Sequence, residues 1–179
     1  MTLAELNATD CESFVAALGW VFEDSAWVAE RASARRPFST LDEVHAAMIS
    51  AVKSASIDEQ LALLRAHPDL GVLRLNADGA DERRQAGPPV SLASHREQTG
   101  AGFDALTRDE LARLRALNAA YREKFGFPFL LAVKGTTKHD VLAALAARLS
   151  APPDHELAEA LRQVFRIAWF RLQDVVTAS

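Results

Sequence analysis

The sequence predicts an all-α fold: one compact domain of about eight helices, interrupted by a long irregular loop at residues 71–90 and a non-helical Phe-Gly-Phe-Pro-Phe segment at residues 125–129. Alanine, the strongest helix former, occurs 34 times in the 179 residues, whereas glycine occurs only 8 times. Ser or Thr followed three residues later by an acidic residue, a pattern that caps helix N-termini, recurs along the chain. The length suits a single domain that covers residues 1–179.

The capping signals and the apolar spacing of three and four residues assign the helices in order. The capping pairs are Thr9/Glu12, Thr40/Glu43, Ser56/Glu59, Thr107/Glu110 and Thr137/Asp140, and Ser25 and Asp154 are simpler caps. We therefore expect helices at residues 10–19, 26–35, 41–54, 57–66, 92–105, 108–125, 138–149 and 154–176. Three tryptophans at helical positions are expected in the core, namely Trp20, Trp27 and Trp169.

Two segments do not have a helical pattern. Residues 71–90 are rich in Gly, Pro, Asn and Asp and are too long for an ordinary connection, so we expect a functional lid or a mobile insertion there. Farther along, Gly126 is a natural helix stop and Pro128 prevents a new helical turn behind it. The apolar side chains around them are expected to be buried, so the backbone needs hydrogen-bond partners from protein, water or a ligand. This predicts a ligand-binding wall at residues 125–133.

Charge and motif content exclude several classes of function. Twenty basic and 24 acidic residues leave a net charge of −4, which argues against a nucleic-acid partner. Cys11 is the only cysteine, and no pair of histidines has metal-ligand spacing, so we expect no metal. The sequence has no phosphate loop, nucleophile elbow or dinucleotide fingerprint. It also has no secretory signal and no membrane-spanning apolar stretch, which predicts a cytoplasmic protein without a membrane partner.

Three polar positions are candidates for chemistry. His67 precedes Pro68, which disfavours helical geometry, so the imidazole is expected at a helix C-terminus, where the helix dipole favours the protonated ring. A C-capping histidine without a further role is an equally good interpretation. Ser94 and Glu97 share one helical face, and the small residues that follow leave room for a ligand, although helix capping explains this pair too. His95 and Arg96 between them are expected to face outward.

Arg171 is the third candidate. Counted at about 100° per residue, its side chain lies between Val164 and Ile167 on the apolar side of the last helix. A guanidinium in that position either extends to the edge of the apolar surface or meets a buried carboxylate, and the first arrangement is the commoner one. A carboxylate ligand would be held by the planar fork of an arginine better than by a lysine.

Three blocks of the sequence together resemble one known family. They are His67-Pro68-Asp69-Leu70, then Ser94-x-x-Glu97-Gln98 followed by Ala101-Gly102-Phe103, then Asn118-x-x-Tyr121-x-x-Lys124-Phe125-Gly126-Phe127-Pro128-Phe129. In combination they resemble the 2-oxo-4-hydroxy-4-carboxy-5-ureidoimidazoline (OHCU) decarboxylases of urate breakdown. The likeness extends from Leu6 to Leu172. The segment between His67 and Ser94 is longer than is usual for this family.

The resemblance implies an all-helical fold, no cofactor, and decarboxylation of the ureidoimidazoline to (S)-allantoin. It places the catalytic histidine at His67, an acid that contacts substrate at Glu97, and the C-terminal catalytic arginine at Arg171. The substrate-binding positions that it implies are Pro68, Ser94, His95, Arg96, Gln98, Phe129, Leu130, Leu131, Ala132 and Val133.

Two other functions fit the sequence. A helical interaction module whose ancestral site has decayed would use residues 71–90 to bind a partner. A related enzyme would act on another ureido or carboxylated heterocycle. The long loop is the only feature of the sequence that suggests a different substrate. The expected partner is a small-molecule substrate, and the aromatic last helix is suited to a homodimer.

Overall fold

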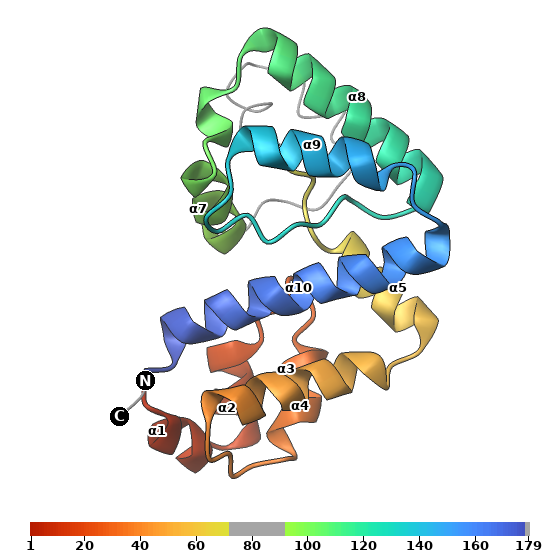
Figure 1. Cartoon of the computed structure of the whole chain (residues 1–179). Helices are drawn as coiled ribbons and strands as arrows, with labels where there is room; N and C mark the ends of the chain where they lie inside the picture. Colours follow the sequence, from red (N-terminus) through yellow and green to blue (C-terminus); the bar gives the residue numbers. More distant parts are fainter. Residues whose placement is uncertain (72–91, 178–179) are drawn as a thin grey trace. The chain divides into compact units, whose positions relative to one another are not determined.

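The computed structural model describes residues 1–71 and 92–177, and it is all-α (Figure 1). Within those residues the only β-type pairing is an isolated bridge between Thr2 and Thr177. The helices are α1 (Leu3–Ala8), α2 (Cys11–Leu18), α3 (Trp27–Ser33), α4 (Leu41–Lys53), α5 (Ile57–Arg65), α7 (Leu92–Gly100), α8 (Arg108–Phe125), α9 (Lys138–Arg148) and α10 (Pro153–Val175), with a short 3-10 helix, η2, at Phe103–Ala105. The fold class predicted from the sequence is therefore confirmed. No helix of the described residues is long and apolar enough to cross a membrane.

The chain forms two compact units. The first contains residues Met1–Ala66 and Val164–Ser179, and the second contains His67–Gln163. The residues of α10 up to Gln163 belong to the second unit, and those from Val164 onward belong to the first.

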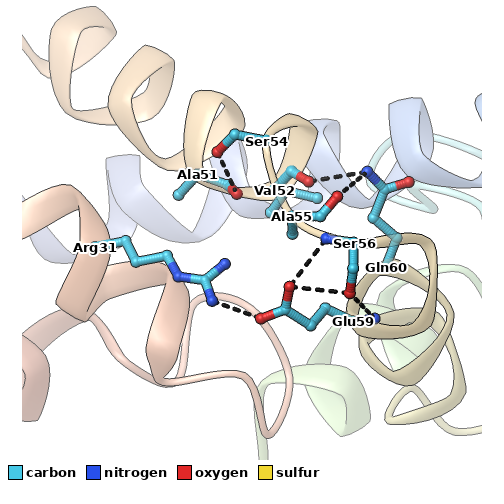
Figure 2. A network of polar contacts seen from close by, with 8 residues as sticks. All are labelled: Arg31, Ala51, Val52, Ser54, Ala55, Ser56, Glu59 and Gln60. Carbon is cyan, nitrogen blue, oxygen red and sulfur yellow. Dashed lines mark hydrogen bonds and ion pairs between the residues drawn. The ribbon is translucent and has the colours of Figure 1, made fainter.

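The first unit is built around α2, α3 and α4, whose apolar faces are fully buried at Phe14, Val28 and Met48. Figure 2 shows how polar contacts join α5 to this group: Arg31 of α3 pairs with Glu59 of α5, and Glu59 also closes a capping box with Ser56. The amide of Gln60 donates to two carbonyls at the C-terminal end of α4, Val52 at 3.0 Å and Ala55 at 3.3 Å. These contacts hold the helix that leads directly to His67.

The two ends of the chain meet in the first unit. The terminal amine of Met1 donates to the carbonyl of Val175 at 3.1 Å, and the amide of Thr177 donates to the carbonyl of Met1 at 2.9 Å. Figure 1 shows the N-terminus beside the C-terminal end of α10. The amine therefore satisfies a carbonyl at the C-terminal end of α10, where a positive charge is favourable to the helix dipole.

The second unit is built around α8, with α9 packed beside it. Lys138 at the start of α9 donates to Glu110 of α8 at 2.7 Å and to the carbonyl of Ala105 at 2.8 Å. Tyr121 of α8 is completely buried, and its ring lies against those of Phe125, Phe127 and Phe129. The chain after α8 therefore folds back onto the helix that it leaves.

Capping boxes form at Ser56/Glu59, Thr107/Glu110 and Thr137/Asp140, as the sequence predicts. At Thr40/Glu43 the cap is present, but Glu43 binds the amide of Ser39 and not that of Thr40.

Three predicted caps are wrong. Helix α2 is capped by Asp10, one residue after Thr9: the Asp10 carboxylate accepts from the amide of Ser13, whereas the Thr9 hydroxyl donates to the carbonyl of Leu6. Helix α3 has Ala26 at its cap and no side-chain cap, so Ser25 does not act as one. Helix α10 begins at Pro153, a residue suited to the first helical position, which places Asp154 inside the first turn.

Two further expectations are wrong, and one helix of the structure is absent from the prediction. The helix expected at residues 92–105 ends at Gly100, and Gly102 adopts φ +81° before the 3-10 turn of η2, a conformation that breaks the helix. The short helix α1 was not expected. Trp20 is 42% exposed and donates its indole N–H to the carbonyl of Ala17, so it is not a core residue, whereas Trp27 and Trp169 are half-buried.

Candidate active site

His67 lies immediately after α5, in the second unit. The helix ends at Arg65, Ala66 is its C-cap, and the Pro68 ring follows, so the backbone leaves the helix where the sequence predicts. The side chain of His67 is 3% exposed, and Pro68 is buried with it. A buried imidazole on non-helical backbone needs the surrounding chain to hold it in one orientation.

Side chains from two helices hold the residues that follow. We call residues 67–71 the His67–Gly71 segment. Arg122 of α8 donates to the carboxylate of Asp69 at 2.9 Å, and Asn118, one turn earlier on α8, donates to the carbonyl of Leu70 at 2.9 Å. The amide of Gly71 donates to the side-chain oxygen of Gln98 on α7 at 2.7 Å. Three successive residues after Pro68 are therefore tied to helices of the same unit.

The electrostatics of Asp69 reflect its burial. Removal from water raises the pKa of the Asp69 carboxyl above its usual value, and the Arg122 cation beside it acts in the opposite direction. Both side chains are mostly covered, with 21% and 26% of their surfaces exposed. Their contact is therefore screened by water less than a surface ion pair is.

Gly71 ends the segment in a backbone conformation that favours glycine. Its φ is +83°, and a Cβ at this position would lie 2.4 Å from a methyl carbon of buried Leu114 on α8. Both facts exclude a larger residue unless its neighbours move. The turn after His67 thus depends on this glycine.

Helix α7 presents two faces. Ser94 and Gln98, four residues apart, are buried, Glu97 is half-buried, and His95 and Arg96 are exposed. Ser94 is inside the helix, which begins at Leu92, so helix capping does not explain the Ser94/Glu97 pair. The outward direction expected for His95 and Arg96 is confirmed.

The residues after α8 form an irregular stretch, residues 126–133, which we call the strap. Gly126 is exposed and Leu131 is half-buried, and the other residues of the strap are buried. Gly126 caps α8 with φ +76°, and no helix is assigned before α9. The strap is held by side chains: the amide of Ala132 donates to Gln163 at 3.1 Å, and the carbonyl of Leu130 accepts from Arg148 at 2.8 Å. The amide of Ala132 is therefore already engaged by protein.

A buried polar cluster supports the strap. Glu156, 1% exposed, accepts hydrogen bonds from the hydroxyl of Tyr121 and from the guanidinium of Arg148, which also lies over the ring of Phe129. Burial, and then the hydrogen bond to Glu156, raise the pKa of the Tyr121 hydroxyl, which stays protonated as a donor. This cluster therefore packs directly against the strap through Arg148, which contacts both Leu130 and Phe129.

Arg171 lies in the first unit and meets a buried carboxylate. Its guanidinium donates to Glu23 at 2.9 Å and to the carbonyl of Val21 at 3.3 Å, and both charged side chains are at most 4% exposed. The commoner arrangement, with the charge extended to the surface, is not the one present. Arg162 and Arg166 on the same helix are exposed, as the helical count predicts.

The structure thus brings some of the predicted residues together. The His67–Gly71 segment is joined to α7 through Gln98, and Arg171 belongs to the other unit with Glu23. Sequence reasoning missed Glu23 altogether, and it assigned no role to Asn118 although the motif contains it. The expected lid at residues 71–90 lies outside the described residues except for Gly71.

Known proteins resemble this chain over almost its whole length. The family model described as OHCU decarboxylase matches residues 7–173. A 2-oxo-4-hydroxy-4-carboxy-5-ureidoimidazoline decarboxylase of Haloferax volcanii is 42% identical over 97% of this chain and 95% of its own length. The uric acid degradation bifunctional protein PucL of Bacillus subtilis is 41% identical over 98% of this chain, which spans only 33% of that longer protein.

Two solved structures share the fold. The crystal structure of (S)-allantoin synthase matches with a TM-score of 0.74 and 35% identity, covering 98% of this chain and 54% of that chain. The crystal structure of OHCU decarboxylase in the presence of (S)-allantoin matches with a TM-score of 0.65 and 23% identity, which supports the fold alone.

Proposed function

Because this chain belongs to the OHCU decarboxylase family, we propose that it catalyses cofactor-independent decarboxylation of 2-oxo-4-hydroxy-4-carboxy-5-ureidoimidazoline to (S)-allantoin and carbon dioxide in urate breakdown. The observation that carries the proposal is the buried His67 at the head of a segment tied to α7 and α8. An imidazole held in this way suits proton transfer at a defined atom of a small substrate.

The reaction needs no external electron sink. The substrate carries a hydroxyl and a carboxylate on one ring carbon next to a ring imine. When the carbon–carbon bond to the carboxylate breaks, carbon dioxide leaves and the electron pair passes into the imine, giving an enediamine. The former imine carbon, which carries the ureido group, is then protonated on one face. The hydroxyl gives up its proton and becomes the ring carbonyl, so a single enantiomer of allantoin results. The protein's tasks are to orient the carboxylate and to move protons.

We assign these tasks to the residues of the motifs. His67 is the general acid and base, a role that contributes about 10² to 10⁴ in rate. Glu97 orients the imidazole or accepts hydrogen bonds from ureido and ring N–H groups. Arg171 anchors the substrate carboxylate or stabilises developing negative charge.

The binding surface is assigned to α7 and the strap. Pro68, Ser94, Gln98 and Phe129 belong to the proposed substrate-binding set, and His95 and Arg96 enter it only as parts of the motif because they are exposed. Since the Ala132 amide already binds Gln163, donation to the ring carbonyls falls to the amides of Leu130, Leu131 and Val133.

The test follows freshly generated substrate by circular dichroism. The wild-type chain is expected to accelerate formation of (S)-allantoin over the spontaneous, racemic decay. His67→Asn should fold normally and lose this acceleration, whereas His155→Asn, which changes an exposed histidine, should keep it. If the wild-type chain leaves the racemic decay unchanged, the decarboxylase proposal fails, and a decayed interaction module or an enzyme for another heterocycle takes its place.

A further inference from the structure

Two side chains of α8 contact the His67–Gly71 segment without having a place in the proposed chemistry. Asn118 and Arg122 are four residues apart and so lie on one face of the helix. Asn118 binds the carbonyl of Leu70, and Arg122 binds the carboxylate of Asp69, in each case at 2.9 Å. The contacts reach the second and third residues after His67, across sequence separations of 53 and 48 residues.

Each of these two side chains has one polar atom that is buried without a hydrogen-bond partner among the described residues, and this lowers the stability of the folded protein. In the described part of the chain, the side-chain oxygen of Asn118 and the Nε of Arg122 are buried and have no hydrogen-bond partner. A buried polar atom without a partner lowers stability, so apolar residues on this helix face would stabilise the packing better. The presence of Asn118 and Arg122 is therefore better explained by their contacts with the His67–Gly71 segment than by a contribution to stability.

The segment itself has little freedom apart from these contacts. Pro68 restricts the backbone beside His67, and at the other end the amide of Gly71 donates to the side-chain oxygen of Gln98 on α7. With Asp69 and Leu70 tied to α8, the peptide after His67 is held at every residue from 68 to 71. Loss of either α8 contact would release the middle of the segment while both ends stay in place.

We propose that Asn118 and Arg122 are positioning residues that set the orientation of the His67 imidazole through the His67–Gly71 segment. The inference rests on the proposed role of His67 in decarboxylation. The two residues do not touch substrate; they act by keeping the catalytic imidazole at the distance and angle that proton transfer requires.

The test compares matched variants of the full-length chain. Arg122→Met and Asn118→Leu remove the two contacts, and Arg122→Lys keeps a cation for Asp69. Arg115→Met removes the same charge from an exposed position on the same helix and is the control. For each variant, kcat and KM are measured with freshly generated ureidoimidazoline, and the ring-proton signals of His67 are followed by NMR, with exposed His155 as the reference.

Arg122→Met and Asn118→Leu are expected to lower kcat by up to about 10²-fold with little change in KM, because misplacing a catalytic group slows the chemical step. The His67 signals should shift or broaden in both variants, while those of His155 stay in place. Arg122→Lys should recover much of kcat, and Arg115→Met should match the wild type.

Two results would overturn the inference. One is an unchanged kcat with unmoved His67 signals in Arg122→Met and Asn118→Leu. The other is a loss of activity that only parallels loss of folded protein, so that the folded fraction retains the wild-type kcat. If Arg122→Met fails to fold, Asp69→Asn, which keeps the shape of the side chain, tests the same contact, and if Asn118→Leu fails to fold, Arg122→Met and Asp69→Asn carry the test. If the wild-type chain shows no decarboxylation, the proposed function fails, yet the NMR comparison still decides whether α8 positions His67.

Discussion

The ion pair between Arg171 and Glu23 is almost completely buried, so its two charges depend on each other. Moving charges out of water is unfavourable, and removal of one partner leaves the other charge in a poor environment. Any loss of activity in an Arg171 variant must therefore be separated from a loss of stability. Arg171 thus has a part both in the proposed chemistry and in the stability of the fold.

We predict that Arg171→Met lowers the free energy of unfolding by about 3–5 kcal/mol, because the Glu23 carboxylate loses its cation inside the protein. Urea unfolding measures the effect. The double variant Glu23→Gln with Arg171→Met should be more stable than Arg171→Met alone, since neither charge of this pair then remains. Equal stability of the single and double variants would contradict this account of the pair.

Gly71 is the second residue whose conformation has an energetic consequence. We predict that Gly71→Ala costs about 1–2 kcal/mol for the left-handed backbone and a further amount for the contact with Leu114. Gly135→Ala is the matched control, because Gly135 has φ +81° and no atom within 4 Å of the added carbon. Thermal or urea unfolding of both variants should show the larger loss at Gly71, and equal losses would show that Leu114 yields without cost.

Among the elements, the start of α8 shows how a cap and a neighbouring helix act together. Glu110 closes the capping box with Thr107 and binds Lys138 of α9. The Lys138 hydrogen bond, and then the backbone amide of Thr107, lower the pKa of Glu110 from 4.5 to about 2. The ionised carboxylate is thus favoured in the folded protein.

This shift predicts a pH-dependent contribution to stability. Because the folded-state pKa of Glu110 is below the unfolded one, its stabilising effect is complete above pH 4.5 and is lost as the pH falls toward about 2. Glu110→Gln should therefore be less stable than the wild type near neutral pH, and the difference should shrink as the solution is acidified through this range. Urea unfolding at several pH values checks this, and a difference independent of pH would rule it out.

The whole molecule consists of two compact units that one family model spans, since its match runs from residue 7 to residue 173. His67 and Glu97 belong to one unit and Arg171 to the other. The cytoplasmic location stays a prediction.

The oligomeric state is also a property of the whole molecule. The aromatic last helix is suited to a homodimer, and Phe165, Trp169 and Phe170 on it are half-buried in the structure. Light scattering on the purified protein is expected to give twice the 19.5 kDa mass of one chain. A mass equal to one chain at micromolar concentration would contradict the dimer.

Most of the secondary structure could be predicted because its signals are local. Capping boxes, helix stops and apolar spacing act within about four residues, so they can be recognised in the sequence itself. The failures are local ambiguities: Asp10 competes with Thr9 as a cap, and the six residues of α1 are too few to show a period. Gly102 lay inside a helical pattern, and only its left-handed conformation shows that the helix has ended.

The sequence by itself determined the all-α fold, the order of the helices, and the position of His67 just after a helix. Only the tertiary structure decided that Glu23 pairs with Arg171, 148 residues away, and that Asn118 and Arg122 hold the segment after His67. The physical reason is range: helix formation depends on near neighbours, whereas the partner of a buried charge or amide depends on which helix faces it after packing.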